Sequence, residues 1–313
     1  MPNSYSLSQC DELRPTCGHC RRLGDECSFD ALAPDPLSGA SNEQLFTIDD
    51  MRLLHKCLQD EPLFGDQDAA AARQDQNSLM QLAFAHPYVL HTKLSLTALD
   101  LFHHDPANVK YYRQASAHNL AALRYARPNI SRGSKEHSEA IWTFSALTSL
   151  YAFVEPPLRL LSSEYASTVD PIQDLLNAFW MGRGINTVMA LNEEHLKKAG
   201  KPDHSKWPDD RVLVRNTVES EYVQLGQLKE LVSRCCNPNE ASILHKALQD
   251  LFETIALLDK KPLNDSSARL IQTWPMHLDA SILAMMEARN PLALVVVAHY
   301  AVMVNQRRNI WFF

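Results

Sequence analysis

The chain has 313 residues, of which 45% are hydrophobic and 21% are charged, and these proportions are ordinary for a soluble globular protein. A formal net charge of −7 excludes the overall basic character of dedicated nucleic-acid binders, so any DNA contact has to come from a local patch. The most apolar stretch, residues 291–304, is shorter than the roughly 20 residues of a membrane span. Residues 1–30 hold no apolar signal region. We therefore expect an intracellular protein without a membrane span.

In chain order, the sequence divides into three parts. Residues 1–29 contain four of the seven cysteines, and clustered cysteines in a reducing compartment indicate a metal site rather than disulfides. Residues 30–44 hold two prolines, a glycine and small polar residues, the composition of a linker. Residues 45–313 carry apolar residues at helical spacing and form the main domain.

The main domain is predicted to be helical throughout, because glycine is scarce and no alternating strand pattern occurs. Asp170 followed by Pro171 predicts a capped helix start, and Asn290 followed by Pro291 begins the last helix. The pair Pro156-Pro157 predicts a break. We thus expect an all-α fold, a helical regulatory domain preceded by a small partial cysteine module and a linker. The predicted helices are a short one from about residue 47, then 79–103, 106–126, 136–153, one from 170, 211–233, 240–258, 277–289 and 292–306.

The cysteine module has the spacing Cys10-x6-Cys17-x2-Cys20-x6-Cys27. Thiolates are soft ligands that hold zinc tetrahedrally, and two cysteines separated by two residues grip one ion from a single turn. Zinc is therefore the expected cofactor. The alternative is four unrelated reduced thiols, which such specific spacing makes the weaker interpretation.

This module resembles the second half of the fungal zinc binuclear cluster, the Zn2Cys6 family, through the pattern C-D-E-x-x-P-x-C-x-x-C-x-x-x-G-x-x-C. The resemblance implies that Cys10, Cys17, Cys20 and Cys27 are the third to sixth metal ligands of that family. It also implies a DNA-binding regulator of transcription. The basic residues of the module, which would then make the DNA contacts, are Arg14, Arg21 and Arg22.

The sequence departs from the family upstream of Cys10. The family has a further C-x-x-C and a basic recognition helix there, whereas residues 1–9 contain no cysteine, lysine or arginine. Residues 1–30 hold three basic and five acidic residues, a net charge of −2. Lys and Arg supply most non-specific DNA affinity, so we expect weak or absent DNA binding by this chain. A missed upstream exon with the first C-x-x-C would restore it. Four cysteines alone could close one zinc site, but not the two-zinc geometry.

The main domain is similar to the regulatory domain of the sterol uptake control protein subgroup. The similar segments are TIDDMRLLH, FAHPYVLH, DPIQDLLNAFWMGRGI and NPLALVVVAHYAV, in the expected order. The resemblance implies a helical domain that senses an apolar ligand such as a sterol, and a nuclear protein that enters from the cytoplasm. The candidate ligand-binding residues are Phe179, Trp180, Met181, Met285, Met286, Val295 and Tyr300. Apolar residues at helical spacing also form ordinary core, and that alternative stays open.

Three functions remain in competition. The first is a transcription regulator, controlling sterol-related or secondary-metabolite biosynthetic genes. The second is a truncated interaction or ligand-binding protein that does not bind DNA, and that forms a homodimer or heterodimer with full-length relatives through the helical domain. The third, an enzyme, ranks last because no H-E-x-x-H, G-x-S-x-G or P-loop pattern is present. His103-His104-Asp105 looks like a metal or acid–base cluster but lies at a predicted helix end, where histidine complements the helix dipole. We predict that the protein is not an enzyme.

Overall fold

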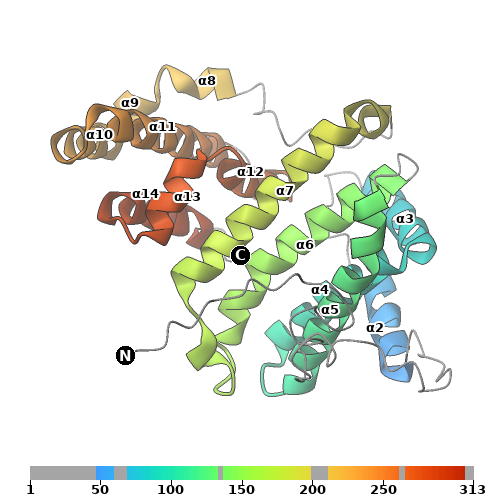
Figure 1. The fold of residues 1–313 in the computed structure, drawn as a ribbon. Helices are drawn as coiled ribbons and strands as arrows, with labels where there is room; N and C mark the ends of the chain where they lie inside the picture. The colour runs from blue at the N-terminus through green and yellow to red at the C-terminus, as the bar shows by residue number, and fades with distance from the viewer. Residues whose placement is uncertain (1–46, 60–68, 133–136, 199–210, 261–264, 307–313) are drawn as a thin grey trace, which may run out of the picture. The chain divides into compact units, whose positions relative to one another are not determined.

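The computed structural model describes residues 47–59, 69–132, 137–198, 211–260 and 265–306, and these residues form helices and no strand. The prediction of an all-α fold is confirmed. Figure 1 shows the helices in chain order. They are α2 (Ile48–Gln59), α3 (Ala69–Ala85), α4 (Pro87–His104), α5 (Val109–Arg132), α6 (Ser138–Arg159), the 3-10 turn η3 (Ala166–Thr168), α7 (Pro171–Lys198), α8 (Val212–Arg215), α9 (Val218–Glu221), α10 (Val223–Cys235), α11 (Pro238–Lys260), α12 (Asp265–Met276), α13 (Ala280–Glu287) and α14 (Pro291–Asn305).

Helix α4 is the most completely buried element of the N-terminal half. The chain divides into the units Met1–Ile48 and Asp49–Phe313, and within the second unit α4 packs against α3, α5 and α6. Its polar side chains are buried along with its apolar ones, including those of His91, Thr92 and Ser95. A helix that is covered on all sides has no amphipathic stripe, which explains why its borders are hard to read from periodicity.

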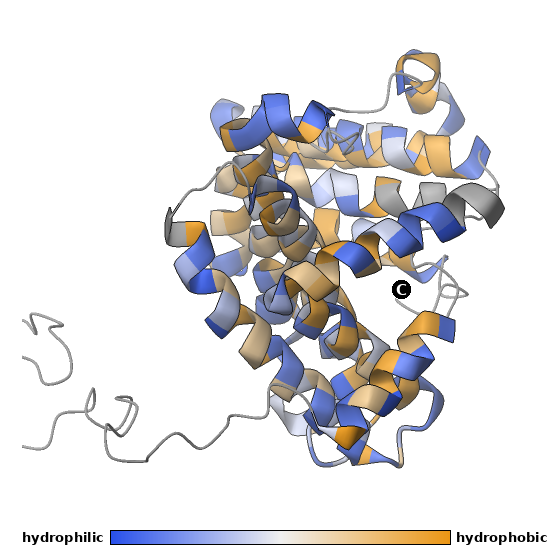
Figure 2. Cartoon of the chain, turned by 90° about the vertical axis from the view of Figure 1, so that its right-hand side faces the viewer, coloured by the Kyte–Doolittle hydropathy of each residue, from blue (hydrophilic) through white to orange (hydrophobic). Residues whose placement is uncertain are grey.

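Helix α7 joins the two halves of the helical unit. It packs along α6 on one side and against α12 and α13 on the other, and Figure 1 shows it in yellow between the green α6 and the orange-red C-terminal helices. There, α11 packs against α10, α12, α13 and α14. Figure 2 shows hydrophobic and hydrophilic residues alternating along many of these helices, as expected for helices with one face on a core.

The predicted cap at Asp170 is confirmed, and Asn290 caps the last helix in the same way. The Asp170 carboxylate accepts from the backbone N–H groups of Ile172 and Gln173 at 3.2 and 3.1 Å. The Asn290 side chain accepts from Leu292 and Ala293 at 2.9 and 3.3 Å. A side-chain oxygen at these positions satisfies N–H groups that have no partner inside the helix.

The corner between α13 and α14 closes without a glycine. Arg289 has a φ of 56°, and the Arg289 and Asn290 N–H groups donate to Met286 and Met285 carbonyls at 2.9 and 2.8 Å. This pair of bonds is the Schellman arrangement that ends many helices. The Arg289 guanidinium also binds the Asp170 carboxylate at 2.8 Å, which ties this corner to the start of α7.

Several predicted helix borders are wrong; α3 begins at Ala69 and α5 ends at Arg132, for example. The expected helix over 79–103 is divided at His86, because Pro87 begins α4. The expected helix over 211–233 is three elements, α8, α9 and α10. The expected break at Pro156-Pro157 does not occur, since α6 continues to Arg159. A proline inside a helix removes a backbone hydrogen bond and crowds the preceding turn, but here Arg159 stabilises the last turn through ion pairs with Glu155 at 2.9 Å and Asp174 at 2.7 Å.

The apolar residues 291–304 form a core helix, as predicted. In α14 the side chains of Ala293, Val296, Tyr300 and Met303 are buried. Within the described ranges, no single helix has the length and hydropathy of a membrane span. Only α13 and α14 taken together, with a bend of 105° between them, reach that length and hydropathy.

Candidate functional site

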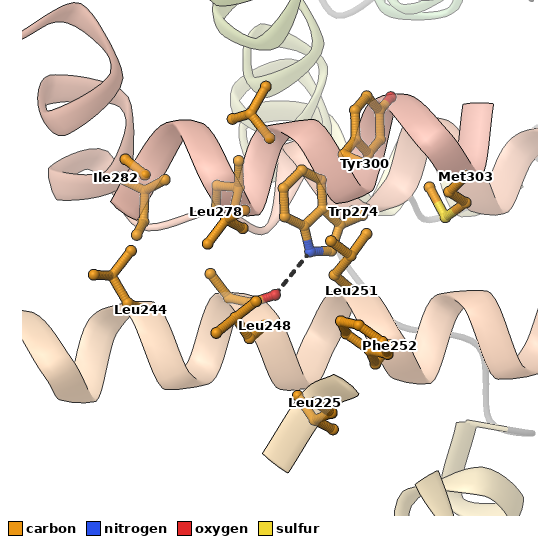
Figure 3. Close-up of a cluster of buried hydrophobic side chains, with 14 of the residues drawn as sticks. Leu225, Leu244, Leu248, Leu251, Phe252, Trp274, Leu278, Ile282, Tyr300 and Met303 are labelled. Carbon is orange, nitrogen blue, oxygen red and sulfur yellow. Dashed lines mark hydrogen bonds between the residues drawn. The ribbon is translucent and has the colours of Figure 1, made fainter. Parts of the chain in front are cut away.

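Three aromatic rings form the centre of the C-terminal core. Phe179 on α7 lies edge-on to Tyr300 on α14, with ring centroids 5.4 Å apart, and to Trp274 on α12 at 6.1 Å. Trp274 and Tyr300 stack at 4.9 Å. Each of the three side chains is at most 1% exposed. Figure 3 shows Trp274 between the leucines of α11 and Tyr300. The group therefore joins helices from three parts of the sequence.

The polar atoms of this aromatic group are bound to the main chain. The Trp274 indole N–H donates to the Ala247 carbonyl at 3.1 Å, and the Tyr300 hydroxyl donates to the Ile271 carbonyl at 3.3 Å. Burial raises the pKa of Tyr300, so the hydroxyl stays a neutral donor. A ligand site needs a few polar groups that fix the orientation of the ligand. Both of these groups are already used to hold helices together.

The seven predicted ligand residues do not lie together. Phe179, Met286 and Tyr300 are buried in the C-terminal core, and Met285 packs against that core while partly exposed. Val295 is partly buried, and its carbonyl accepts a hydrogen bond from His299 Nδ1 at 2.8 Å. Trp180 and Met181 are 50% and 39% exposed on α7. The structure thus brings three of the seven into one interior and leaves two on the surface.

Trp274, the residue at the centre of this group, is not among the candidate residues predicted from the sequence. The sequence does contain a pattern that indicates its helix, α12. Leu270, Ile271 and Trp274 have the i, i+1, i+4 spacing of a helix face, and all three are buried. Pro275 follows directly and lies inside α12. A proline inside an apolar pattern favours a helix boundary, whereas α12 includes Pro275 and ends at Met276.

A second group is a buried chain of polar side chains that links α2, α4 and α5. His118 Nε2 lies 3.0 Å from the Asp50 carboxylate, and His118 Nδ1 lies 2.8 Å from His91 Nδ1. His91 stacks on the Tyr125 ring at 5.5 Å. Since a carboxylate only accepts, His118 carries its proton on Nε2, its Nδ1 accepts, and His91 Nδ1 donates. The chain fixes one tautomer for each ring.

Burial keeps both rings neutral near pH 7. Desolvation lowers the pKa of His91 to about 4, and the neighbouring His118 adds to this while Asp50 opposes it. Desolvation also lowers the pKa of His118 against the opposing effect of Asp50. Protonating His118 would place two N–H groups against each other at the 2.8 Å contact. The contact between the two rings therefore requires an uncharged His118, and burial disfavours the charged form of His91 as well.

Acidification is expected to weaken the fold through these two histidines. Because their pKa values are lower in the folded chain than in the unfolded one, the unfolded chain takes up protons first as the pH falls below about 6.5. For His91, whose folded pKa is about 4, the free energy of unfolding should fall by about 3 kcal/mol between pH 6.5 and pH 4. Urea denaturation at several pH values measures this loss.

The control compares two histidine variants. The variant His91→Gln removes one titrating group from the polar chain and should be less sensitive to pH than the parent over the same interval. His103 is exposed, so His103→Gln should retain the parent's pH dependence. Equal pH dependence in all three proteins would contradict the expected role of the polar chain.

A third group of ionisable residues lies where α5, α6 and α7 meet. The Tyr112 hydroxyl donates to Glu155 at 2.5 Å, and Arg159 binds both Glu155 and Asp174. Burial raises the pKa of the Glu155 carboxyl, although Tyr112 and Arg159 act against that shift. The charges of Arg159, Glu155 and Asp174 are paired, although Arg159 Nε and one Asp174 oxygen make no hydrogen bond of good geometry. This network of ion pairs and a hydrogen bond therefore links α5, α6 and α7.

The other residues considered for chemistry fall into structural roles. His104 Nδ1 lies 2.8 Å from the Asp100 carbonyl one turn earlier in α4. A Cβ on Gly182 would lie 3.4 Å from Ser149 Oγ of α6, an ordinary van der Waals contact, so crowding between α6 and α7 does not require glycine at this position. Among the described residues, no group of three His, Cys, Asp or Glu side chains could hold a metal.

The predicted zinc and DNA residues lie outside the described ranges. This applies to the cysteines Cys10, Cys17, Cys20 and Cys27 and to the arginines Arg14, Arg21 and Arg22. Comparison with known proteins gives no match to a family model, to a curated protein or to a solved structure. The class that the described residues define is an all-α protein in which two packed groups of helices share the long helix α7.

Proposed function

We propose that this chain is a non-catalytic regulator of transcription of the fungal zinc-cluster type, acting in the nucleus after entry from the cytoplasm. The observation that carries the proposal is the spacing of Cys10, Cys17, Cys20 and Cys27 with the flanking C-D-E-x-x-P pattern. Four thiolates are the donor set of a tetrahedral zinc site, and they suffice for one ion.

The positions of the family-like segments support the proposal for the main domain. TIDDMRLLH lies in α2, FAHPYVLH spans the junction of α3 and α4, DPIQDLLNAFWMGRGI begins α7, and NPLALVVVAHYAV begins α14. The last two begin at the capping residues Asp170 and Asn290. Resembling segments that start helices in the expected order are consistent with a shared helical regulatory domain. An apolar ligand such as a sterol belongs to the same proposal.

The second candidate is an interaction or ligand-binding protein that does not read DNA. The observation in its favour is the net charge of −2 over residues 1–30, from three basic and five acidic residues. Phosphate contacts require cations. A module of this charge would bind a duplex weakly even when zinc is bound.

The test is zinc stoichiometry by native mass spectrometry on the full chain. We expect one zinc per chain, released by a chelator. Cys20→Ser should lose the ion while the far-ultraviolet dichroism stays helical, because the helical unit has its own core. Cys235 is exposed and distant in sequence, so Cys235→Ser is the matched control and should keep the ion. A folded parent chain that binds no zinc would overturn the zinc-cluster proposal.

Fluorescence anisotropy with labelled duplex DNA separates the two candidates. A zinc-loaded chain whose binding falls steeply with added salt supports the transcription regulator. A zinc-loaded chain without measurable DNA binding supports the interaction or ligand-binding protein.

A further inference from the structure

The corner between α10 and α11 carries two adjacent cysteines. Cys235 is the last residue of α10, and Cys236 ends the helix with extended backbone angles of φ −116° and ψ 158°. Cys235 is exposed and Cys236 is partly exposed. The neighbours Ser233, Arg234 and Asn237 are exposed as well. A small molecule in solution can therefore reach both thiols.

Hydrogen bonds hold the backbone of this corner on both sides. The Cys236 N–H donates to the Val232 carbonyl at 3.0 Å. Asn237 caps α11, because its side chain accepts from the Glu240 N–H at 2.9 Å and its carbonyl accepts from the Ala241 N–H at 2.9 Å. The Cys236 side chain also packs against the C-terminal core. The two thiols thus lie on an ordered turn, so a ligand that binds both does not have to order a loose segment.

Adjacent cysteines are poorly placed to form a disulfide with each other. Cα atoms joined by a trans peptide are about 3.8 Å apart, whereas disulfides usually join Cα atoms about 4.4–6.8 Å apart. An atom inserted between the two sulfurs relaxes this constraint. Bonds to a soft centre of about 2.3 Å, as in zinc thiolates, hold two sulfurs farther apart than an S–S bond of about 2.05 Å. The pair is therefore better suited to a soft centre that bridges both sulfurs.

The surroundings of the pair select the kind of centre. In the part of the chain that the structure describes, no group of three His, Cys, Asp or Glu side chains could hold a metal. A metal ion that needs three or four protein ligands therefore has no complete site at this corner. A trivalent arsenical with one organic group needs only two thiols, because the organic group occupies the third of the three bonds of arsenic.

The environment of Cys236 disfavours the chemistry of a thiolate. Burial, Glu240 and Cys235 all raise the pKa of the Cys236 thiol, and the negative end of the α10 dipole acts in the same direction. The thiolate is the form that oxidants attack, so a protonated Cys236 is a poor oxidant sensor. Condensation with an arsenic–oxygen group, by contrast, consumes thiol protons.

We propose that Cys235 and Cys236 together form a binding site for trivalent arsenicals that carry one organic group. Each sulfur forms one bond to arsenic, the arsenic–oxygen double bond breaks, and the oxygen leaves as water with the two thiol protons. Arsenic stays trivalent and neither sulfur is oxidised, so the step needs no oxidant or reductant. The site uses only the α10–α11 corner and does not depend on zinc or DNA binding.

The test is protection of these thiols from alkylation in the full, reduced chain, with phenylarsine oxide as the probe. The chain is mixed with several equivalents of the probe, treated with excess N-ethylmaleimide at mildly alkaline pH, and digested with trypsin. Cleavage after Arg234 and Lys246 places both cysteines on the peptide 235–246. We expect the probe to lower the alkylation of this peptide at least about 10-fold, as for a contact made through two linked bonds. An added dithiol should restore alkylation.

The other cysteines keep this result separate from the zinc proposal. Those near the N-terminus lie on other tryptic peptides, so protection at 235–246 is measured whether or not they hold zinc. Cys57 is completely buried and is the internal control. Its alkylation should be the same with and without the probe.

Single-cysteine variants test whether both thiols are required. In Cys236→Ser the exposed Cys235 remains without its neighbour, and the protection that the probe gives it should fall at least about 10-fold, because one arsenic–sulfur bond replaces two. Cys235→Ser changes an exposed side chain, so it should keep the fold and leave Cys236 equally unprotected. A parent chain in which neither thiol is protected would overturn the proposal. So would protection that is as strong in the two variants as in the parent.

Discussion

Replacing Trp274 with alanine should lower the free energy of unfolding by about 4 kcal/mol, the range of large-to-small changes at buried aromatic sites. The side chain is completely buried, stacks on Tyr300 with centroids 4.9 Å apart, and meets the edge of Phe179 at 6.1 Å. Alanine would leave a cavity between α11, α12 and α14 (Figure 3). It would also remove the hydrogen bond from the indole N–H to the Ala247 carbonyl, and a hydrogen bond of this kind contributes about 1 kcal/mol.

Chemical denaturation monitored by far-ultraviolet dichroism measures this loss. The matched control is Trp180→Ala, because Trp180 lies on α7 and is 50% exposed. It should cost under about 1 kcal/mol, mainly through its contact with Arg183. Trp274→Phe keeps most of the apolar area and should fall between the two. A Trp274→Ala protein as stable as Trp180→Ala would show that the aromatic group does not hold the C-terminal helices together.

The parts of the fold that the sequence predicted are those that depend on neighbours along the chain. Asp170 and Asn290 cap the helices that follow them within three residues, so local chemistry decides both starts. The all-α class also follows from local preference summed over many residues. The predictions of helix borders were wrong where tertiary contacts determine the border. Residues 211–222 contain no glycine or proline, yet the helix is interrupted there.

The candidate site was less predictable, because it depends on which helix faces meet. Phe179 and Trp180 are adjacent in sequence, but about 100° separates them around the helix. One is fully buried and the other half exposed. Only the positions of α12 and α14 determine which of them is interior. The polar chain joins Asp50, His91 and His118 across 68 residues of sequence, and no spacing rule connects such positions.

The buried ion pairs of α11 should be as sensitive to mutation as the aromatic group, for an electrostatic reason. Arg211 donates to both Asp250 and Glu253, and the three residues are 5%, 8% and 0% exposed. Removing one partner of a buried ion pair leaves an uncompensated charge and costs about 3–5 kcal/mol. Arg211→Met should therefore destabilise the chain strongly, since two carboxylates lose their shared cation.

Two exposed cations place the expected loss of stability in Arg211→Met at the lower end of the range of about 3–5 kcal/mol. Lys246 lies 2.7 Å from Asp250, and Arg215 lies 3.5 Å from Glu253. Both side chains are mostly in solvent, at 67% and 58% exposure, so they compensate only part of the lost interaction. We therefore expect Arg211→Met to cost about 3 kcal/mol, measured as the shift in the denaturation midpoint at constant slope.

Two comparisons separate a desolvated charge from a general loss of packing. Lys198→Met removes an ion pair with Glu194 whose side chains are 73% and 80% exposed, and it should cost under about 0.5 kcal/mol. The triple variant Arg211→Met/Asp250→Leu/Glu253→Leu removes all three buried charges at once. Because replacing a whole buried ion pair with apolar groups is often neutral or stabilising, the triple variant should be more stable than Arg211→Met alone. A triple variant less stable than Arg211→Met would contradict the electrostatic explanation. It would mean that the three side chains stabilise the contact between Arg211 and α11 through their shape and packing.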